Sequence, residues 1–274
     1  MYRVFTVFIA AVAIASSAPF ASAGPCSLEV SPLTLELQFE PGRAYTDTIR
    51  IKNLSEQPER IHAYCQDWTL KPDGVVVFVA AGKLPGSASP YVQLAPSEFE
   101  LEPGATQQVR YTIRLPAEVT SEVRTAVIFE AAAREVSAPN APSRLVPRLG
   151  TILYVQPGPR PPTHARAAGF EIDREKGLLT VENLGEAHLR FSGQLEIRDE
   201  RGALVRRHDL NPFVVLPPPF NRHISKLDST VLEDLPAGRY QVTALLDYGG
   251  EALLGARVEV DLGPEPPDEV VDES

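Results

Sequence analysis

Proline is the residue that most restricts the folds open to this chain, because it occurs 26 times in 274 residues and is spread along the whole length. A proline inside a helix costs about 3 kcal/mol, which argues against a mainly helical protein. Between the prolines, apolar residues recur at every second position, as in Leu33, Leu35 and Leu37. This period of two is typical of strands with one buried face. The sequence therefore predicts an all-β protein.

Strands separated by Pro, Gly and Asn turns are predicted in both halves of the chain. In the first half they are Leu28–Val30, Leu33–Leu37, Thr48–Asn53, Arg60–Thr69, Val75–Ala80, Phe99–Glu102, Gln107–Leu115, Arg124–Ala131 and Arg144–Val155. In the second half they are Phe170–Ile172, Leu178–Asn183, His188–Asp199, Phe213–Leu216, Asn221–Lys226, Gly238–Tyr248 and Ala252–Val260. Residues 82–96 and 134–144 are predicted to be loops, the second of them mobile, because both are rich in turn-forming residues. About seven strands in roughly 100 residues is the spacing of an immunoglobulin-like sandwich, so we expect two such sandwiches in tandem.

The proline-rich segment at residues 156–162 predicts the domain boundary, since consecutive prolines favour a stiff, extended backbone. We expect a first domain at residues 24–157, a linker at 158–162 and a second domain at 163–263. Residues 264–274 carry five acids and no base, which is typical of a disordered tail.

Residues 1–23 have the pattern of a cleavable signal peptide rather than of a folded segment. Arg3 supplies a positive start, Val4 to Ala15 form an apolar run of about a dozen residues, and Ala21-Ser22-Ala23 is a small-x-small cleavage site. The run is shorter than the roughly 20 apolar residues of a membrane-spanning helix. We therefore expect an exported protein without a membrane span after processing.

Charge and motifs argue against several classes of function. The net charge of −10 would repel phosphate backbones, so nucleic acid is not an expected partner. The five histidines lack the spacing of a zinc site, and no GxSxG or phosphate-binding loop is present. We predict no enzyme, no cofactor and no metal, which leaves binding through surfaces and strand edges.

Cys26 and Cys65 are the only cysteines, so an oxidising compartment allows one intrachain pair. That disulfide would close a loop of about 40 residues and stabilise the fold by roughly 4 kcal/mol. Two separate thiols or an intermolecular bridge are the alternatives. The spacing is not CxxC, which argues against a redox enzyme.

Residues 144–155 form the most informative predicted strand. Leu145, Pro147, Leu149, Thr151 and Leu153 share one face. Pro147 has no N–H to give to a ladder, so the strand is expected at a sheet edge there, or bulged.

Several short motifs, in their order along the chain, resemble the N-terminal domain of the periplasmic pilus-assembly chaperones of the chaperone–usher pathway. The motifs are Ser27-Leu28-Glu29-Val30-Ser31-Pro32, Thr48-Ile49-Arg50-Ile51-Lys52-Asn53, Gln66-Asp67-Trp68, Pro72-Asp73-Gly74, Leu101-Glu102-Pro103-Gly104, Gln108-Val109-Arg110 and Glu122-Val123-Arg124. The resemblance covers residues 27–157, and the second domain only in architecture and position. It implies a divergent member with two immunoglobulin-like domains, located in the periplasm.

In that family the last strand of the first domain lends alternating apolar side chains to an incomplete pilin-like subunit, which is a form of strand addition. The matching donor-strand positions are Leu145, Pro147, Leu149, Thr151 and Leu153. The resemblance further implies a secreted pilin-like or surface-coat subunit as partner, an outer-membrane usher in the pathway, and a free form able to cap its strand as a homodimer. The alternative is that these side chains fill the domain's own core or edge.

The family anchors the subunit's carboxylate with two basic residues, and this chain departs from the pattern at both. The first position falls near Pro32 and Leu33, and the second at Thr151 or Ile152, none of which is charged. Arg148 and Arg160 are the nearest candidate substitutes.

The leading functional hypothesis is a periplasmic chaperone that holds a strand-deficient subunit and so protects an aggregation-prone edge. The second is a structural or adhesive exported protein whose two sandwiches are spacers. A third, a carbohydrate-binding module, would need an exposed aromatic row, and the chain has a single Trp. A chaperone needs the apolar face of residues 145–155 accessible, whereas a spacer would cover it with its own chain.

Overall fold

A computed structural model describes residues 4–5, 28–40, 42–138 and 141–263. The chain divides into two compact units, one made of Met1–Trp68 and Phe78–Arg160, the other of Thr69–Val77 and Pro161–Ser274. The segment Thr69–Val77, which the sequence analysis placed in the first domain, thus groups with the second unit. Each unit is an immunoglobulin-like β-sandwich, so the predicted all-β fold class is confirmed.

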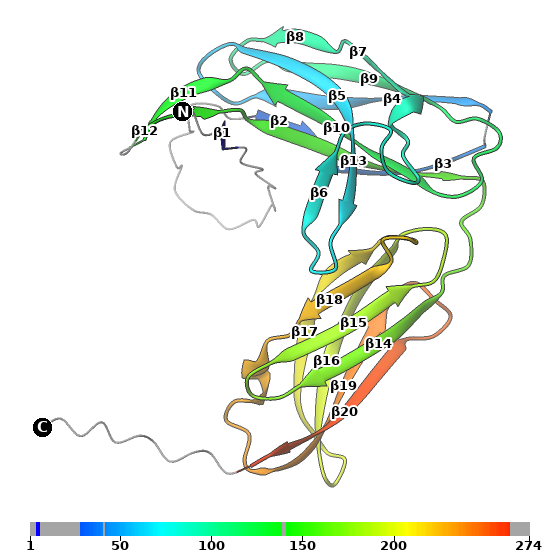
Figure 1. The fold of residues 1–274 in the computed structure, drawn as a ribbon, viewed down its shortest axis with the longest axis vertical. Coiled ribbons are helices and arrows are strands. Elements are labelled where there is room, and N and C mark those ends of the chain that lie inside the picture. The colour runs from blue at the N-terminus through cyan, green and yellow to red at the C-terminus, as the bar shows by residue number, and fades with distance from the viewer. Residues whose placement is uncertain (1–3, 6–27, 41, 139–140, 264–274) are drawn as a thin grey trace, which may run out of the picture. The chain divides into compact units, whose positions relative to one another are not determined.

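The first unit packs a larger sheet against a smaller one (Figure 1). The larger sheet has the order β3-β13-β10-β5-β6, with β8 paired to β5. Its strands are β3 (Thr34–Phe39), β5 (Glu59–Leu70), β6 (Val76–Val79), β8 (Glu98–Leu101), β10 (Val123–Ala131) and β13 (Arg148–Pro157). The smaller sheet has the order β2-β4-β9-β7. Its strands are β2 (Leu28–Ser31), β4 (Ala44–Asn53), β7 (Val92–Ala95) and β9 (Thr106–Arg114).

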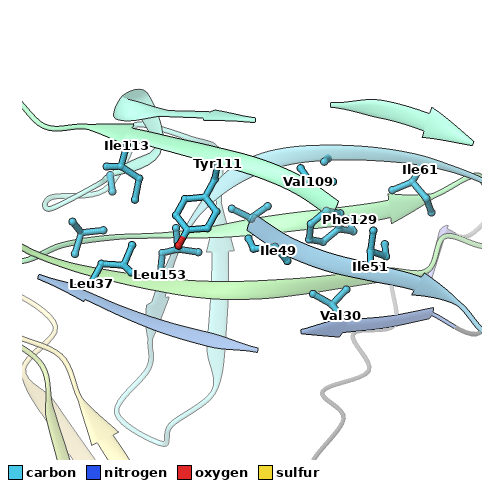
Figure 2. Packing of buried hydrophobic residues seen from close by; sticks show 14 of the residues in the cluster. Val30, Leu37, Ile49, Ile51, Ile61, Val109, Tyr111, Ile113, Phe129 and Leu153 are labelled. Carbon is cyan, nitrogen blue, oxygen red and sulfur yellow. The ribbon is translucent and has the colours of Figure 1, made fainter. Parts of the chain in front are cut away.

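Alternate residues of both sheets meet in one apolar core, which Figure 2 shows. The fully buried side chains include Ile49 and Ile51 of β4, Tyr111 and Ile113 of β9, Phe129 of β10 and Leu153 of β13. The period-two pattern of the sequence is therefore the inward face of each strand.

Two predicted loops of the first unit are wrong in part. Residues 82–96 contain a 3-10 helix, η1 (Ser89–Tyr91), and the strand β7. Residues 134–144 contain β11 (Arg134–Ala138) and β12 (Ala141–Leu145), which pair as a hairpin, and β1 (Val4–Phe5) pairs parallel to β12. The loop prediction failed there because it used composition alone. Segments rich in Ser, Pro and Ala can form strands where a neighbouring strand supplies backbone hydrogen bonds.

The second unit pairs the sheet β14-β15-β18 with the sheet β17-β16-β19-β20. The seven strands are β14 (Ala165–Ile172), β15 (Gly177–Asn183), β16 (Leu189–Asp199), β17 (Leu204–Val215), β18 (Arg222–Lys226), β19 (Gly238–Asp247) and β20 (Leu254–Leu262), with a 3-10 helix η2 (Ser229–Leu232). All seven predicted strands are present, but β17 begins nine residues earlier than Phe213. Its first part is an edge strand of mostly polar residues, which hides the apolar alternation.

Asn53 and Asn183 hold the same kind of turn in the two sandwiches. Each is fully buried at the end of its strand, and each side-chain amide donates to a carbonyl four residues later and to a distant carbonyl. Each Oδ1 accepts from the backbone N–H two residues later. The two turns therefore satisfy buried backbone groups in the same way.

Candidate functional site

The sequence predicted one continuous donor strand from residue 144 to 155, but the structure divides it into two strands. β12 ends at Leu145, and β13 starts at Arg148. Pro147 lies in the break, where its carbonyl accepts a hydrogen bond from the N–H of Ala131 at 3.0 Å. Proline interrupts the strand because it cannot return the second hydrogen bond of that pair.

The two halves of β13 have different neighbours. β13 pairs antiparallel with β10 from Arg148, opposite Glu130, to Val155, opposite Val123. On the other side β3 pairs in parallel only from Ile152, which lies opposite Thr34. Within the described part of the chain, no strand pairs with residues 148–150 on that side. The first half of β13 is therefore an open sheet edge.

The open half directs backbone groups outward. The N–H of Ile152 donates to the carbonyl of Leu33 at 2.9 Å, away from β10. Because successive residues of a strand alternate in direction, Arg148 and Gly150 point their N–H and C=O groups to the same side as Ile152. Two residues thus offer backbone donors and acceptors to an additional strand.

The predicted row of apolar side chains is divided by burial. Leu153 is fully buried in the core (Figure 2), and Thr151 is fully buried with its hydroxyl donating to the carbonyl of Pro32 at 2.7 Å. Leu149 is half-buried and packs against the same core, while Leu145 and Pro147 are half-buried. The chain's own core covers two of the five positions and leaves three partly accessible.

Gly150 lets β13 lie close to β10. A Cβ at this position would come within 2.9 Å of Ile128 Cδ1 and 3.1 Å of the Val127 carbonyl oxygen. The first distance is shorter than real Cβ atoms show and the second is tighter than most, so a side chain at position 150 would force the tip of Ile128 and the strand backbone to shift.

Arg148 makes an internal ion pair. Its Nε lies 2.7 Å from Glu130 Oε2, and the hydroxyl of Tyr64 donates to the same oxygen at 2.8 Å. Burial, and then the hydrogen bond to Glu130, raise the pKa of Tyr64 to about 12. Because Arg148 is already paired with the Glu130 carboxylate, it is poorly suited to anchor the carboxylate of a bound subunit.

Arg160, the other candidate anchor, lies 4.0 Å from Glu36 Oε2, and both side chains are nearly half exposed. The positions named for the two family anchors keep backbone roles instead, since the carbonyls of Pro32 and Leu33 accept from Thr151 and Ile152. A carboxylate anchor at Arg148 or Arg160 stays a prediction.

Leu33 belongs beside the open edge, although the sequence analysis grouped it with Leu35 and Leu37 as an inward residue. It is 45% exposed, and it directly precedes β3 where β3 meets β13. No period-two argument could identify it, because the residue lies in the break between β2 and β3.

Cys65, in β5, is half-buried and has no disulfide partner among the residues that the structure describes. Burial raises its pKa to about 12. Cys26 lies outside the described residues, as does nearly all of the segment 1–23, so the disulfide and the signal peptide stay predictions.

Trp68 is 3% exposed but lies apart from the main apolar cluster. Its ring meets Tyr154 edge-on at 5.5 Å, and the Arg124 guanidinium lies 6.0 Å from its centroid. Tyr240 and Tyr248 both contact the core of the second unit.

Among the described residues, no group of His, Cys, Asp and Glu has the arrangement of a metal site. No helix in that part of the chain has the length and apolar character needed to cross a bilayer.

No protein-family model and no curated protein matches the sequence. Solved structures do match, among them pilus chaperones of low sequence identity. The class 5 fimbriae chaperone CfaA is 15% identical with a TM-score of 0.46, covering 88% of this chain and 100% of that one. The SafB chaperone, solved in complex with the Salmonella enterica SafA pilin, is 16% identical with a TM-score of 0.46, covering 88% and 99%. The Pseudomonas aeruginosa CupB2 chaperone is 13% identical with a TM-score of 0.42, covering 85% and 100%.

Proposed function

We propose that this protein is an exported chaperone that binds a strand-deficient subunit of a surface structure at the open edge of β13. The observation that carries the proposal is the open first half of that strand. There, Arg148 and Gly150 direct backbone groups outward, and Leu145, Pro147 and Leu149 remain partly accessible. An extended segment of a client can pair with this edge as an added strand.

The division of the apolar row defines which side chains are lent. Leu145, Pro147 and Leu149 would enter the client's groove, while Thr151 and Leu153 keep the first sandwich folded. The added strand would also satisfy the hydrogen-bonding groups of the client's exposed backbone and cover an edge that otherwise promotes aggregation.

The proposed location and pathway rest on the signal peptide that the sequence predicts. Residues 1–23 would direct the chain to the periplasm, where it would keep its pilin-like client until an usher accepts it. Without a client, the same open edge could pair with that of a second copy.

The burial of Thr151 and Leu153 is the specific observation that favours the alternative, a protein of two spacer sandwiches. A spacer would have no stoichiometric client. The two functions therefore differ in what the protein retains from its own periplasm.

The test is a native pull-down of the tagged protein from that compartment, with mass spectrometry of what is retained. Leu149→Asp places a charge at the half-buried centre of the open edge, and Leu204→Asp is the matched control at an exposed leucine of the second unit. A small β-rich secreted protein retained by wild type and by Leu204→Asp, but lost from Leu149→Asp, supports strand donation. Thermal unfolding of both variants separates lost binding from lost folding. The absence of any stoichiometric partner from wild type, or its undiminished retention by a folded Leu149→Asp variant, contradicts the proposal.

A further inference from the structure

The second unit has two neighbouring strands that belong to different sheets and do not pair. β17 is the edge of one sheet and β18 the edge of the other in the described chain. A cavity of about 540 Å³ lies against both strands. We call it the β17–β18 groove and define it by Leu210, Phe213, His223, Ile224, Lys226 and Asp228.

The edge of β18 offers backbone groups to this groove. Ile224 lies opposite Thr180 of β15, yet its N–H points away from β15 and donates to the carbonyl of Pro72 at 2.6 Å. By strand alternation, Lys226 also directs its N–H and C=O away from β15. Pro72 lies in a tight turn of the same unit, closed by the hydrogen bond from the Gly74 N–H to the Lys71 carbonyl. This turn occupies the edge at Ile224, and within the described residues no backbone hydrogen bond is formed by the outward N–H of Lys226.

The wall of the groove carries a buried side chain with an unused acceptor. The imidazole of His223 is 9% exposed and stacks on Phe213 at 4.3 Å. Its Nδ1 is buried and has no hydrogen-bond partner in the described chain. Burial also lowers the pKa of His223, so the ring is neutral at neutral pH. One nitrogen of a neutral imidazole can accept a hydrogen bond.

Charge around the groove is unbalanced. Asp73, Asp209 and Asp228 line it, against the single cation Lys226. Hydrogen bonds from Thr230 hold the pKa of Asp228 below its usual range, so that carboxylate is ionised at neutral pH. An occupant that brings a positive charge would therefore be favoured over one that brings a negative charge.

We propose that the β17–β18 groove binds an extended segment of a partner protein that carries a lysine or arginine, added as a strand to the edge of β18. The backbone of the segment pairs with the groups that Lys226 leaves open. Its apolar side chains pack over Phe213 and Leu210, and its cation lies between Asp209 and Asp228. This surface is independent of the open edge of β13.

The direct test is fluorescence anisotropy with the purified chain and a labelled heptapeptide of alternating Thr and Val with a central Lys. The matched peptide has Glu in place of Lys. We expect saturable binding of the Lys peptide, at least tenfold tighter than binding of the Glu peptide. Leu149→Asp, which alters the proposed client site, is expected to bind the Lys peptide like wild type.

Two substitutions dissect the site. Lys226→Pro removes the outward N–H without touching the ladder to β15, and Lys226→Ala removes the same charge but keeps the N–H. We expect Lys226→Pro to bind about fivefold more weakly than Lys226→Ala. The double variant Asp209→Asn and Asp228→Asn should weaken the Lys peptide about tenfold, whereas the pair Asp199→Asn and Asp261→Asn, outside the groove, should not.

The proposal is overturned if the Lys peptide shows no saturable binding, or if it binds no better than the Glu peptide. Equal affinity of Lys226→Pro and Lys226→Ala would rule out strand addition. Because the β13 edge is tested by Leu149→Asp and the groove by Lys226→Pro, each idea can fail without the other.

Discussion

Replacing the buried asparagines that close the two equivalent turns should destabilise the two sandwiches separately. In Asn53→Ala, the carbonyls of Gln57 and Leu101 lose donors at 2.8 and 2.9 Å, and the N–H and hydroxyl of Ser55 lose an acceptor at 2.9 and 2.7 Å. A hydrogen bond contributes about 1 kcal/mol net, and a buried group left without a partner costs more. The Ser55 hydroxyl keeps other partners, so we expect a loss of about 3–4 kcal/mol.

Asn183→Ala removes one hydrogen bond fewer. Its amide donates to the carbonyls of Ala187 and Val215 at 2.8 and 3.0 Å, and its Oδ1 accepts from Gly185 at 2.8 Å. The expected loss is about 2–3 kcal/mol. For units of this size, either change should lower the Tm of its own sandwich by about 10 °C.

Differential scanning calorimetry of both variants, beside the exposed-residue control Asn211→Ala, measures these losses. The control should change stability by no more than about 0.5 kcal/mol. If Asn53→Ala and Asn183→Ala unfold within the range of the control, then these amides do not satisfy the buried backbone as described. The equivalence of the two turns would then be a resemblance of shape without energetic meaning.

Three further predictions concern packing and titration. Gly150→Val should destabilise the first unit by about 1–3 kcal/mol in urea unfolding because of the contact with Ile128, whereas Gly255→Val, where a Cβ meets nothing within 4 Å, should not. Tyr64 should titrate near pH 12 in an absorbance titration. Because its folded pKa is raised, its contribution to stability is present below pH 10 and is lost as pH rises toward 12. A normal titration near 10 would contradict its burial against Glu130. His223 has a lowered pKa in the folded state, so stability should fall as pH drops below about 6.5, the unfolded value, and His223→Phe should flatten this dependence in urea unfolding at several pH values.

The position of most strands could be predicted from the sequence, because the inward residues of β9, of β19 and of the second half of β4 alternate regularly. The strands that were missed lack such a pattern. β7 has only two alternating apolar residues, Val92 and Leu94, within a segment rich in Gly, Pro and Ser. β11 and β12 have five residues each and no apolar alternation, and the first part of β17 is mostly polar. Their strand conformation depends on ladder partners far away in the chain, such as Ile113 opposite Val92. Such distant pairing cannot be predicted from the composition of the strand itself.

The candidate site was predictable to the same extent. The period of two identified Leu149, Thr151 and Leu153 as one face, but the division of that face depends on where β3 starts to pair with β13. The ion pair of Arg148 with Glu130 likewise follows from the β10–β13 register, which places them opposite each other. The equivalence of Asn53 and Asn183, by contrast, was open to sequence reasoning, since both are followed by Leu, a small residue and Glu.

The size of the open edge limits how a client could be held. Arg148 and Gly150 together offer four backbone groups, which at about 1 kcal/mol each contribute roughly 4 kcal/mol at most. A complex that survives isolation needs about 8 kcal/mol, corresponding to a micromolar Kd. The difference has to come from apolar burial, and at about 25 cal/mol per Å² it requires roughly 160 Å² of apolar surface. The accessible parts of Leu145, Pro147 and Leu149, with Leu33 beside them, are the side chains placed to supply it. It follows that a charge at Leu149 should damage client binding more than the loss of a single backbone hydrogen bond.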